Sequence, residues 1–199
     1  MNKITISGKI ESNPELSYKA FNENFYSFAI SSLRTSGTAD VIKCIAPEII
    51  AANITEGDNV IIYGEVRTQN WNCENGKRKL RLYIFCKDIQ PYSGGDVNYV
   101  DILGYTCKEA TYRTTPLGRE ITDAILACNR VTGQSDYIPC IAWGRNARWL
   151  TDMGVGAEIH AIGRLQSREY TKKFDDGTTQ SMVTYELSLS KLEKVAKEE

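Results

Sequence analysis

The sequence RTSGTADVIKCIA at residues 34–46 recurs in altered form as RVTGQSDYIPCIA at residues 130–142. The residue pairs shared by the two stretches, each 96 positions apart (from 34 to 130), are Arg34/Arg130, Gly37/Gly133, Asp40/Asp136, Ile42/Ile138, Cys44/Cys140, Ile45/Ile141 and Ala46/Ala142. A repeat of this length is a whole domain, because solenoid units span only roughly 20–50 residues. The sequence therefore predicts one small fold that is used twice.

The composition is compatible with two small soluble domains. The chain has 199 residues, of which 42% are hydrophobic, and a net charge of −1. This charge excludes a strongly basic protein that coats nucleic acid, but it allows a local basic groove. No apolar run approaches the ~18 residues of a membrane span, and the N-terminal MNKITISGKI lacks a secretory segment. We expect a cytoplasmic protein with no membrane partner.

The six cysteines are widely spaced, and none forms a C-x-x-C pair. That spacing disfavours zinc sites. Cys44 and Cys140 fall at equivalent repeat positions within apolar strands, so we expect small buried core residues in a reducing cytosol. We expect neither a metal nor a cofactor.

Strand signals dominate both halves, since β-branched and aromatic residues concentrate in five segments of each. The predicted strands are 4–10, 25–34, 40–46, 59–71 and 80–89, and then 99–106, 121–130, 136–143, 158–170 and 181–192. A helical stretch, 47–55 or 144–153, separates the third and fourth strands of each set. ENGK (74–77) and DDGT (175–178) are hairpin turn signals between the last two strands. This order predicts an all-β protein with one short helix per domain, built as two tandem five-stranded OB-fold barrels.

The predicted domains are residues 1–90 and 99–199, joined by a linker at 91–98. The segment QPYSGGD (90–96) carries Pro, Ser and two glycines, which is typical of a linker. Its shortness should keep the two barrels close together.

A binding face is predicted on the second copy. Along strand 158–170, Ile159, Ala161, Gly163 and Leu165 form the inward row, and the outward row is His160, Ile162, Arg164, Gln166, Arg168 and Tyr170. Tyr137 and Trp143 share one face of strand 136–143, and Lys172 and Lys173 follow Tyr170. Aromatic rings interleaved with cations can stack bases and neutralise phosphates. Cross-strand packing is the alternative explanation for each aromatic residue taken singly.

The first copy presents a poorer version of this face. Arg67, Gln69 and Trp71 keep a cation, an amide and an aromatic ring, but Val41 and Pro47 replace Tyr137 and Trp143. Candidate replacements are Lys43, the basic residues Lys77, Arg78 and Lys79 of segment 77–81, and Phe21, Phe25 and Tyr26.

The second copy resembles the bacterial single-stranded DNA-binding proteins through segments 111–130, 135–150 and 156–171, and the first copy resembles them more faintly through 7–16, 34–46 and 60–72. The resemblance implies an OB fold that wraps single-stranded DNA, with bases stacked on Tyr137, Trp143, Tyr170 and Trp71. It also implies four OB folds per assembly, which a homodimer would supply. The family's acidic tail tip is missing from the final KLEKVAKEE (191–199), so recruitment of repair enzymes is not expected.

The predicted function is non-enzymatic, sequence-tolerant binding of single-stranded DNA in replication, recombination or repair. A nucleoid-associated bacterial protein is expected, with a chromosomal, phage or plasmid gene left open. The alternative is a primosomal-like OB-fold accessory protein that acts mainly through protein contacts. An enzyme is disfavoured, because the one histidine, His160, has no obvious partner and no Walker, G-x-S-x-G or H-E-x-x-H motif occurs.

Overall fold

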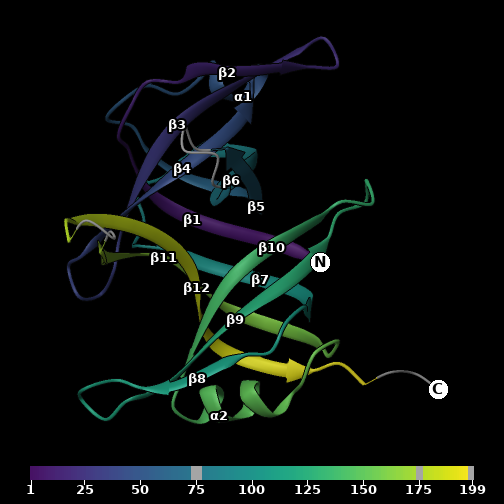
Figure 1. Cartoon of the computed structure of the whole chain (residues 1–199). Coiled ribbons are helices and arrows are strands. Elements are labelled where there is room, and N and C mark those ends of the chain that lie inside the picture. Colours follow the sequence, from purple (N-terminus) through teal and green to yellow (C-terminus); the bar gives the residue numbers. More distant parts are fainter. Residues whose placement is uncertain (73–77, 174–176, 197–199) are drawn as a thin grey trace.

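A computed structural model describes residues 1–72, 78–173 and 177–196. For Trp71, Asn72, Arg78, Lys79, Lys172 and Lys173 it describes the backbone only. The candidate residue Lys77 lies outside the described residues. Within the described residues, twelve strands form one continuous sheet that curls into two barrels, one above the other in Figure 1.

The two halves contain the same elements in the same order. The first half comprises β1 (Asn2–Ile10), β2 (Glu15–Ala20), β3 (Glu23–Leu33), β4 (Ala39–Pro47), α1 (Glu48–Ala51), β5 (Asn59–Asn72) and β6 (Arg78–Pro91). The second half comprises β7 (Asn98–Thr106), β8 (Thr111–Thr114), β9 (Glu120–Asn129), β10 (Ser135–Trp143), α2 (Arg145–Asp152), β11 (Glu158–Lys173) and β12 (Thr179–Lys194).

The strand pairing confirms two OB-fold barrels. The sheet runs β2-β3-β4-β6-β5-β1-β7-β11-β12-β10-β9-β8, so the second half mirrors the first. The pairs β1–β3 and β7–β9 close the two barrels. Each barrel has one parallel pair, β4–β6 or β10–β12, and its other paired strands are antiparallel.

Two short edge strands were not predicted. β2 pairs with β3, and β8 pairs with β9. Almost every residue of both strands is exposed, so their sequences lack the alternation that marks a strand with one buried face. They extend the five predicted strands of each barrel by one hairpin arm.

The helices lie at opposite ends of the molecule, α1 beside the first barrel and α2 beside the second (Figure 1). The prediction for α2 is right to within one residue at each end, and Ala147 and Leu150 anchor it to the core. The prediction of a helix over 47–55 is too long, because α1 ends at Ala51. Beyond it, Thr55 donates its backbone N–H and its hydroxyl to the Asp58 carboxylate, and this turn replaces further helix.

The predicted inward row of β11 is confirmed. Ile159, Ala161 and Leu165 are fully buried. Gly163 lies at a register shift in the pairing with β12, where a Cβ atom would come within 2.2 Å of the Ser188 carbonyl oxygen. Gly64 occupies the corresponding shift between β5 and β6. Close backbone approach therefore requires glycine at both bulges.

The core prediction for Cys44 and Cys140 is confirmed, and four of the five described cysteines are buried. Cys44, Cys86, Cys128 and Cys140 are buried, and burial raises the pKa of the Cys128 thiol to about 12. Cys107 is exposed and lies just after the end of β7. Cys73 lies outside the described residues.

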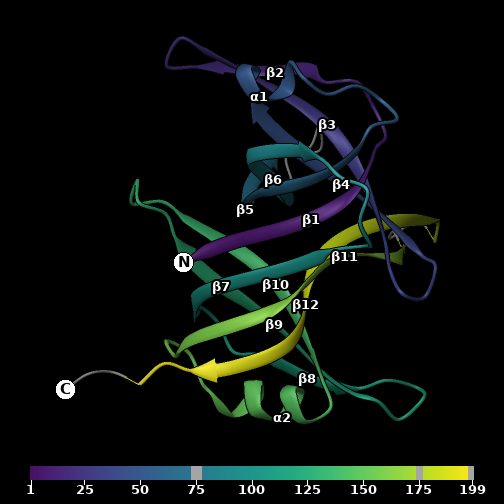
Figure 2. The ribbon, with the colours of Figure 1, turned by 180° about the vertical axis from the view of Figure 1, so that it is seen from behind.

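A pseudo-two-fold axis relates the barrels. β1 and β7 pair side by side in the middle of the molecule (Figure 2), and Ile4 lies opposite Val100. Val100 is also the repeat counterpart of Ile4, 96 positions later (from 4 to 100). The axis therefore passes through this residue pair, and each barrel meets the other through equivalent surfaces.

Two equivalent ion-paired clusters connect the barrels, and we call them together the interdomain seam. In one cluster the buried Asp136 accepts hydrogen bonds from Arg130 of its own domain and from the backbone N–H of Thr68 of the first domain, at 2.7 and 2.6 Å. In the other, the buried Asp40 accepts from Arg34, at 2.7 Å, and from the backbone N–H of Ser167, at 2.6 Å.

Each arginine of the seam also crosses between the domains. Arg130 donates to the Thr68 carbonyl oxygen at 3.2 Å, and Arg34 donates to the Ser167 carbonyl oxygen at 2.5 Å. Burial alone would raise the pKa of Asp40, but the hydrogen bonds from Arg34 and Ser167 outweigh it and hold the pKa below its usual value. The repeated Arg and Asp residues therefore serve domain docking.

Candidate nucleic-acid interface

The outer face of the second barrel brings two predicted aromatic residues and one cation onto one surface. Tyr137 and Trp143 of β10 are 47% and 39% exposed. Between them on the same face, Ile141 lies opposite Ser188 of β12, which in turn lies opposite Arg164 of β11. Since cross-strand partners point to the same side of a sheet, Arg164 shares the face of Tyr137 and Trp143.

The two aromatic rings of β10 are far apart. Six residues of strand separate them, which corresponds to about 20 Å at roughly 3.3 Å per residue. Tyr137 lies at the interdomain seam, where its backbone N–H donates to the Thr68 hydroxyl at 2.9 Å. Trp143 lies at the opposite end, beside β9. This spacing suits separate bases along one strand of nucleic acid.

Tyr170 extends this face onto the arm formed by β11 and β12. It is 38% exposed and lies opposite Met182. Arg168, two residues earlier, is also exposed, and its Nε donates to Glu186 at 3.2 Å.

Gln166 lies on the outward row of β11, as predicted, but its side chain is not exposed. Its side chain is buried, and its amide donates to Glu186 at 3.1 Å while accepting from Arg164 at 3.3 Å. Alternation along β11 correctly gives the outward direction, but the hydrogen-bonded chain through Arg164, Glu186 and Arg168 covers the amide. Gln166 therefore connects Arg164 to the carboxylate of Glu186, which also accepts a hydrogen bond from Arg168.

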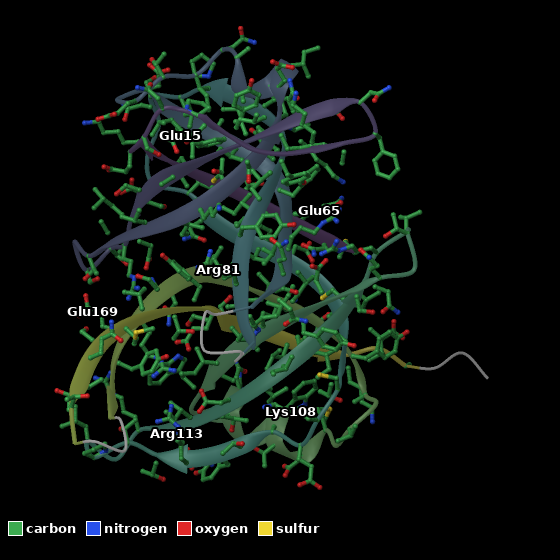
Figure 3. The ribbon with its side chains drawn as sticks, turned by 45° about the horizontal axis from the view of Figure 1, so that its top comes forward. Glu15, Glu65, Arg81, Lys108, Arg113 and Glu169 are labelled. Atoms are coloured by element: carbon green, nitrogen blue, oxygen red, sulfur yellow. The ribbon has the colours of Figure 1, made fainter. Side chains whose placement is uncertain are left out.

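In the first domain, Arg67 is held inside a network instead of facing solvent. Its Nε donates to Glu65 at 2.9 Å and lies 4.0 Å from Asp136, and its guanidinium lies 5.2 Å from the Phe85 ring centre. Burial alone would raise the pKa of Glu65, but Lys87 and Arg67 together hold it below the usual value. Figure 3 shows Glu65 on the first domain, whereas Arg113 belongs to the second.

Other candidates of the first domain lie nearby. Gln69 is exposed and lines an open cavity of about 480 Å³ at the interdomain seam, together with Thr68, Asn70, Tyr83, Arg130, Gln134 and Ser135. Lys43 is exposed and lines a separate cavity with Tyr185 of the second domain. Trp71, Arg78, Lys79, Lys172 and Lys173 have described backbones only, so they are placed by register at the hairpin ends of β5–β6 and β11–β12.

Sequence reasoning missed an aromatic group on the first domain. Tyr18 of β2 stacks on Phe25 of β3, with ring centres 4.8 Å apart and an angle of 13° between the rings. Phe85 of β6 lies 6.1 Å from Phe25. The signal for Phe25 was present, but Tyr18 lies in a segment with no strand pattern. Of the other aromatic candidates, Phe21 is fully exposed at the turn between β2 and β3, and Tyr26 donates to Glu48 on the opposite face.

Histidine, cysteine and carboxylate side chains are the groups that could hold a metal ion or transfer a proton. Among the described residues, no group of three or more histidine, cysteine or carboxylate side chains could hold a metal ion. His160 does have partners, contrary to expectation: its Nε2 lies 2.8 Å from Asp101 and its Nδ1 lies 3.8 Å from Glu193. This is a half-exposed surface network. In the described part of the chain, no helix has the length and apolarity needed to cross a membrane.

Solved structures similar to this chain have the same fold over its whole length. The wild-type single-stranded DNA-binding protein from Thermus aquaticus matches 100% of this chain and 95% of its own, with a TM-score of 0.78 and 18% sequence identity. A deletion mutant of the same protein matches with a TM-score of 0.77. These likenesses establish the tandem OB architecture.

Curated relatives agree at the level of sequence. A single-stranded DNA-binding protein of Clostridium perfringens is 30% identical over 103 residues, which cover 48% of this chain and 69% of the relative. Single-stranded DNA-binding protein 1 of Staphylococcus aureus is 33% identical over 81 residues, which cover 37% of this chain and 48% of the relative.

The family comparison covers both repeats. The sequence model described as the single-strand binding protein family matches residues 1–92 and again residues 97–194. This family comprises DNA-binding proteins that are not enzymes, in agreement with the prediction of a non-enzymatic protein. With the family's fold present twice and its sequence pattern matched in both barrels, the chain belongs to the single-strand binding protein family.

Proposed function

We propose that this protein binds single-stranded DNA without strong sequence preference, in replication, recombination or repair. The observation that carries the proposal is the outer face of the second barrel, where Tyr137 and Trp143 lie exposed on the same side of the sheet as Arg164. The single-stranded DNA-binding proteins to which the chain is similar support the choice of ligand.

Base stacking supplies the sequence-tolerant part of the affinity. Every base has a π-face, so a ring can accept any of them, at roughly 1–3 kcal/mol per stacked base. Tyr137, Trp143 and Tyr170 offer three such rings along β10 and the β11–β12 arm. Their separation means that the bound strand is held at several points.

Phosphate contacts supply the salt-dependent part. Arg168 contacts the carboxylate of Glu186 directly, and Arg164 is connected to it through Gln166. The two arginines and this one carboxylate together carry one net positive charge. Neutralising phosphates releases counterions, and the affinity should therefore fall as salt increases. Lys172 and Lys173 extend the same arm and are proposed as further phosphate contacts.

The first domain is proposed to contribute through Gln69 and Trp71 and through the basic residues Lys43, Lys77, Arg78 and Lys79. Arg67 is proposed to act indirectly, because its guanidinium is committed to Glu65 and Phe85. A homodimer would present four OB folds to the DNA. The outer face of β5, β1 and β7, where exposed Tyr63 and Tyr99 both lie opposite Thr5, is the proposed contact between copies.

The test is the double variant Trp143→Ala/Tyr170→Ala, with Tyr105→Ala as the matched control. Tyr105 is as exposed as Tyr170, but its hydroxyl donates to Glu158 at the far end of β7. Fluorescence anisotropy with labelled oligo(dT) should show a loss of roughly tenfold or more for the double variant, since two stacked bases are removed. Full affinity in the double variant, with the fold intact by circular dichroism, would reject the platform.

A further inference from the structure

The first domain carries an aromatic column that the second domain lacks. Tyr18, Phe25 and Phe85 follow one another from β2 to β3 to β6, with ring centres 4.8 and 6.1 Å apart. Both spacings fall within the roughly 4.5–7 Å range of favourable aromatic pairs. The guanidinium of Arg67 lies 5.2 Å from the Phe85 ring centre at the inner end of this column.

Strand register shows that this column replaces an aromatic residue of the second domain. In the first domain, one row across the sheet reads Tyr18, Phe25, Pro47. The corresponding row of the second domain reads Arg113, Ile121, Trp143. The two rows correspond because Ile121 is the repeat counterpart of Phe25 and Trp143 that of Pro47, each 96 positions later (from 25 to 121 and from 47 to 143).

Each row therefore has one exposed aromatic ring, but on different strands. In the second domain the ring is Trp143 of β10, beside the buried Ile121. In the first domain it is Tyr18 of β2, beside the nearly buried Phe25. The first domain thus lacks an aromatic residue at Pro47 of β4 but has an exposed aromatic ring, Tyr18, two strands away in the same row.

The geometry of Tyr18 leaves room for a ligand. The near-parallel contact with Phe25 uses one face of the ring, and 41% of Tyr18 is still exposed. A base placed on the open face would continue the column in the same stacked arrangement. Around it, Arg67 and Lys87 pair with Glu65, and Arg67 also lies 4.0 Å from Asp136, so cations stand near the ring without a net excess of positive charge.

The turn of the same hairpin points to a ligand as well. Phe21 and Asn22 both have positive φ angles, 51° and 61°, as a type I′ turn requires. Such a conformation is unfavourable for a bulky residue like phenylalanine. Phe21 is nevertheless fully exposed, with no packing in the described structure that explains a large apolar side chain there.

We infer that the β2–β3 hairpin is a second base-stacking site for single-stranded DNA, with Tyr18 as the platform and Phe25 and Phe85 as its support. This inference rests on the proposed function, since it assigns a further subsite to the same ligand. It gives the first domain a stacking surface of its own, built on its edge hairpin instead of β4. A strand leaving Tyr137 at the seam would reach it along the cavity lined by Gln69 and Tyr83.

The test compares three variants of the full chain by anisotropy with labelled oligo(dT). Tyr18→Phe keeps the ring, whereas Tyr18→Leu keeps an apolar cover over Phe25 but removes the stacking surface. Leu16→Ala is the matched control, because Leu16 is an exposed residue of the same strand that lies opposite Tyr26 on the other face of the hairpin. Tyr18→Leu should weaken binding roughly fivefold or more, and the other two variants should bind like the wild type.

A second measurement locates the contact without relying on stability. Oligo(dT) in which 5-iodouracil replaces some of the thymines, irradiated with the wild-type protein, should form an adduct within residues 15–25, found by mass spectrometry. Equal affinities for Tyr18→Leu and Leu16→Ala, with no adduct in this segment, would overturn the inference while leaving the binding function standing. Failure of the wild type to bind oligo(dT) at all would instead reject the proposed function.

Discussion

The interdomain seam yields a prediction whose size can be worked from its contacts. Asp136→Ala removes a carboxylate whose side chain is 1% exposed and which pairs with Arg130, 17% exposed. It also removes the acceptor of the Thr68 backbone N–H, which lies 2.6 Å from Oδ1 of Asp136. Breaking a buried pair by deleting one partner typically costs about 3–5 kcal/mol, because the other charge stays buried without compensation.

The matched control is Asp123→Ala. Asp123 also pairs with one arginine, Arg113, at 2.8 Å, but both side chains are largely exposed. Exposed pairs contribute about 0–1 kcal/mol. The two substitutions therefore delete the same carboxylate chemistry in a buried and an exposed setting.

Thermal unfolding followed by circular dichroism measures the difference. A protein of this size loses roughly 2–4 °C in Tm per kcal/mol, so Asp136→Ala should lower the Tm by about 6–20 °C and Asp123→Ala by less than about 4 °C. Similar small shifts for both variants would refute the reasoning that the seam fixes the two barrels against each other.

Three further outcomes are expected. Gly163→Ala should destabilise the protein by roughly 1–3 kcal/mol in urea unfolding, because its Cβ would meet the Ser188 carbonyl oxygen; an unchanged midpoint would contradict the bulge. Asp40→Asn should reduce the amount by which the free energy of unfolding falls in acid. The lowered pKa of Asp40 gives the wild type stability that is present above the unfolded-state pKa and is lost as the pH falls through the folded-state pKa. Parallel curves of unfolding free energy against pH for the variant and the wild type would contradict this. A thiol reagent should modify Cys107 before the buried cysteines of the described chain, and faster modification of Cys128, whose pKa is about 12, would be inconsistent with the core.

The fold was predictable because the repeat and the alternation are both strong local signals. Ile159, Ala161 and Leu165 could be assigned to the core because every second residue of a half-buried strand faces inward. β2 could not be predicted because its sequence, ELSYKA, is exposed on both faces, so no hydrophobic alternation distinguishes it from a loop. Tyr18 could not be recognised for the same reason, because its place beside Phe25 depends on the pairing of β2 with β3.

The sequence could predict which face of a strand each site residue lies on, but not which side chains surround it. Alternation correctly set Tyr137 and Trp143 on one face, yet it could not reveal that Glu186 and two arginines enclose Gln166. The seam was equally hidden, since Asp136 meets Thr68 across 68 positions of sequence (from 68 to 136). Contacts between distant segments depend on the packing of whole domains, which no local pattern contains.

The central claim is tested most directly by titrating the intrinsic tryptophan fluorescence with oligo(dT) at low and moderate salt, with duplex DNA as the control. We predict strong quenching by the single strand, weakened by salt, because bases stack on exposed Trp143 and phosphate neutralisation releases counterions. The variant Trp149→Phe, which removes the half-buried tryptophan of α2, should retain this quenching. Absence of both quenching and binding at low salt would contradict the account.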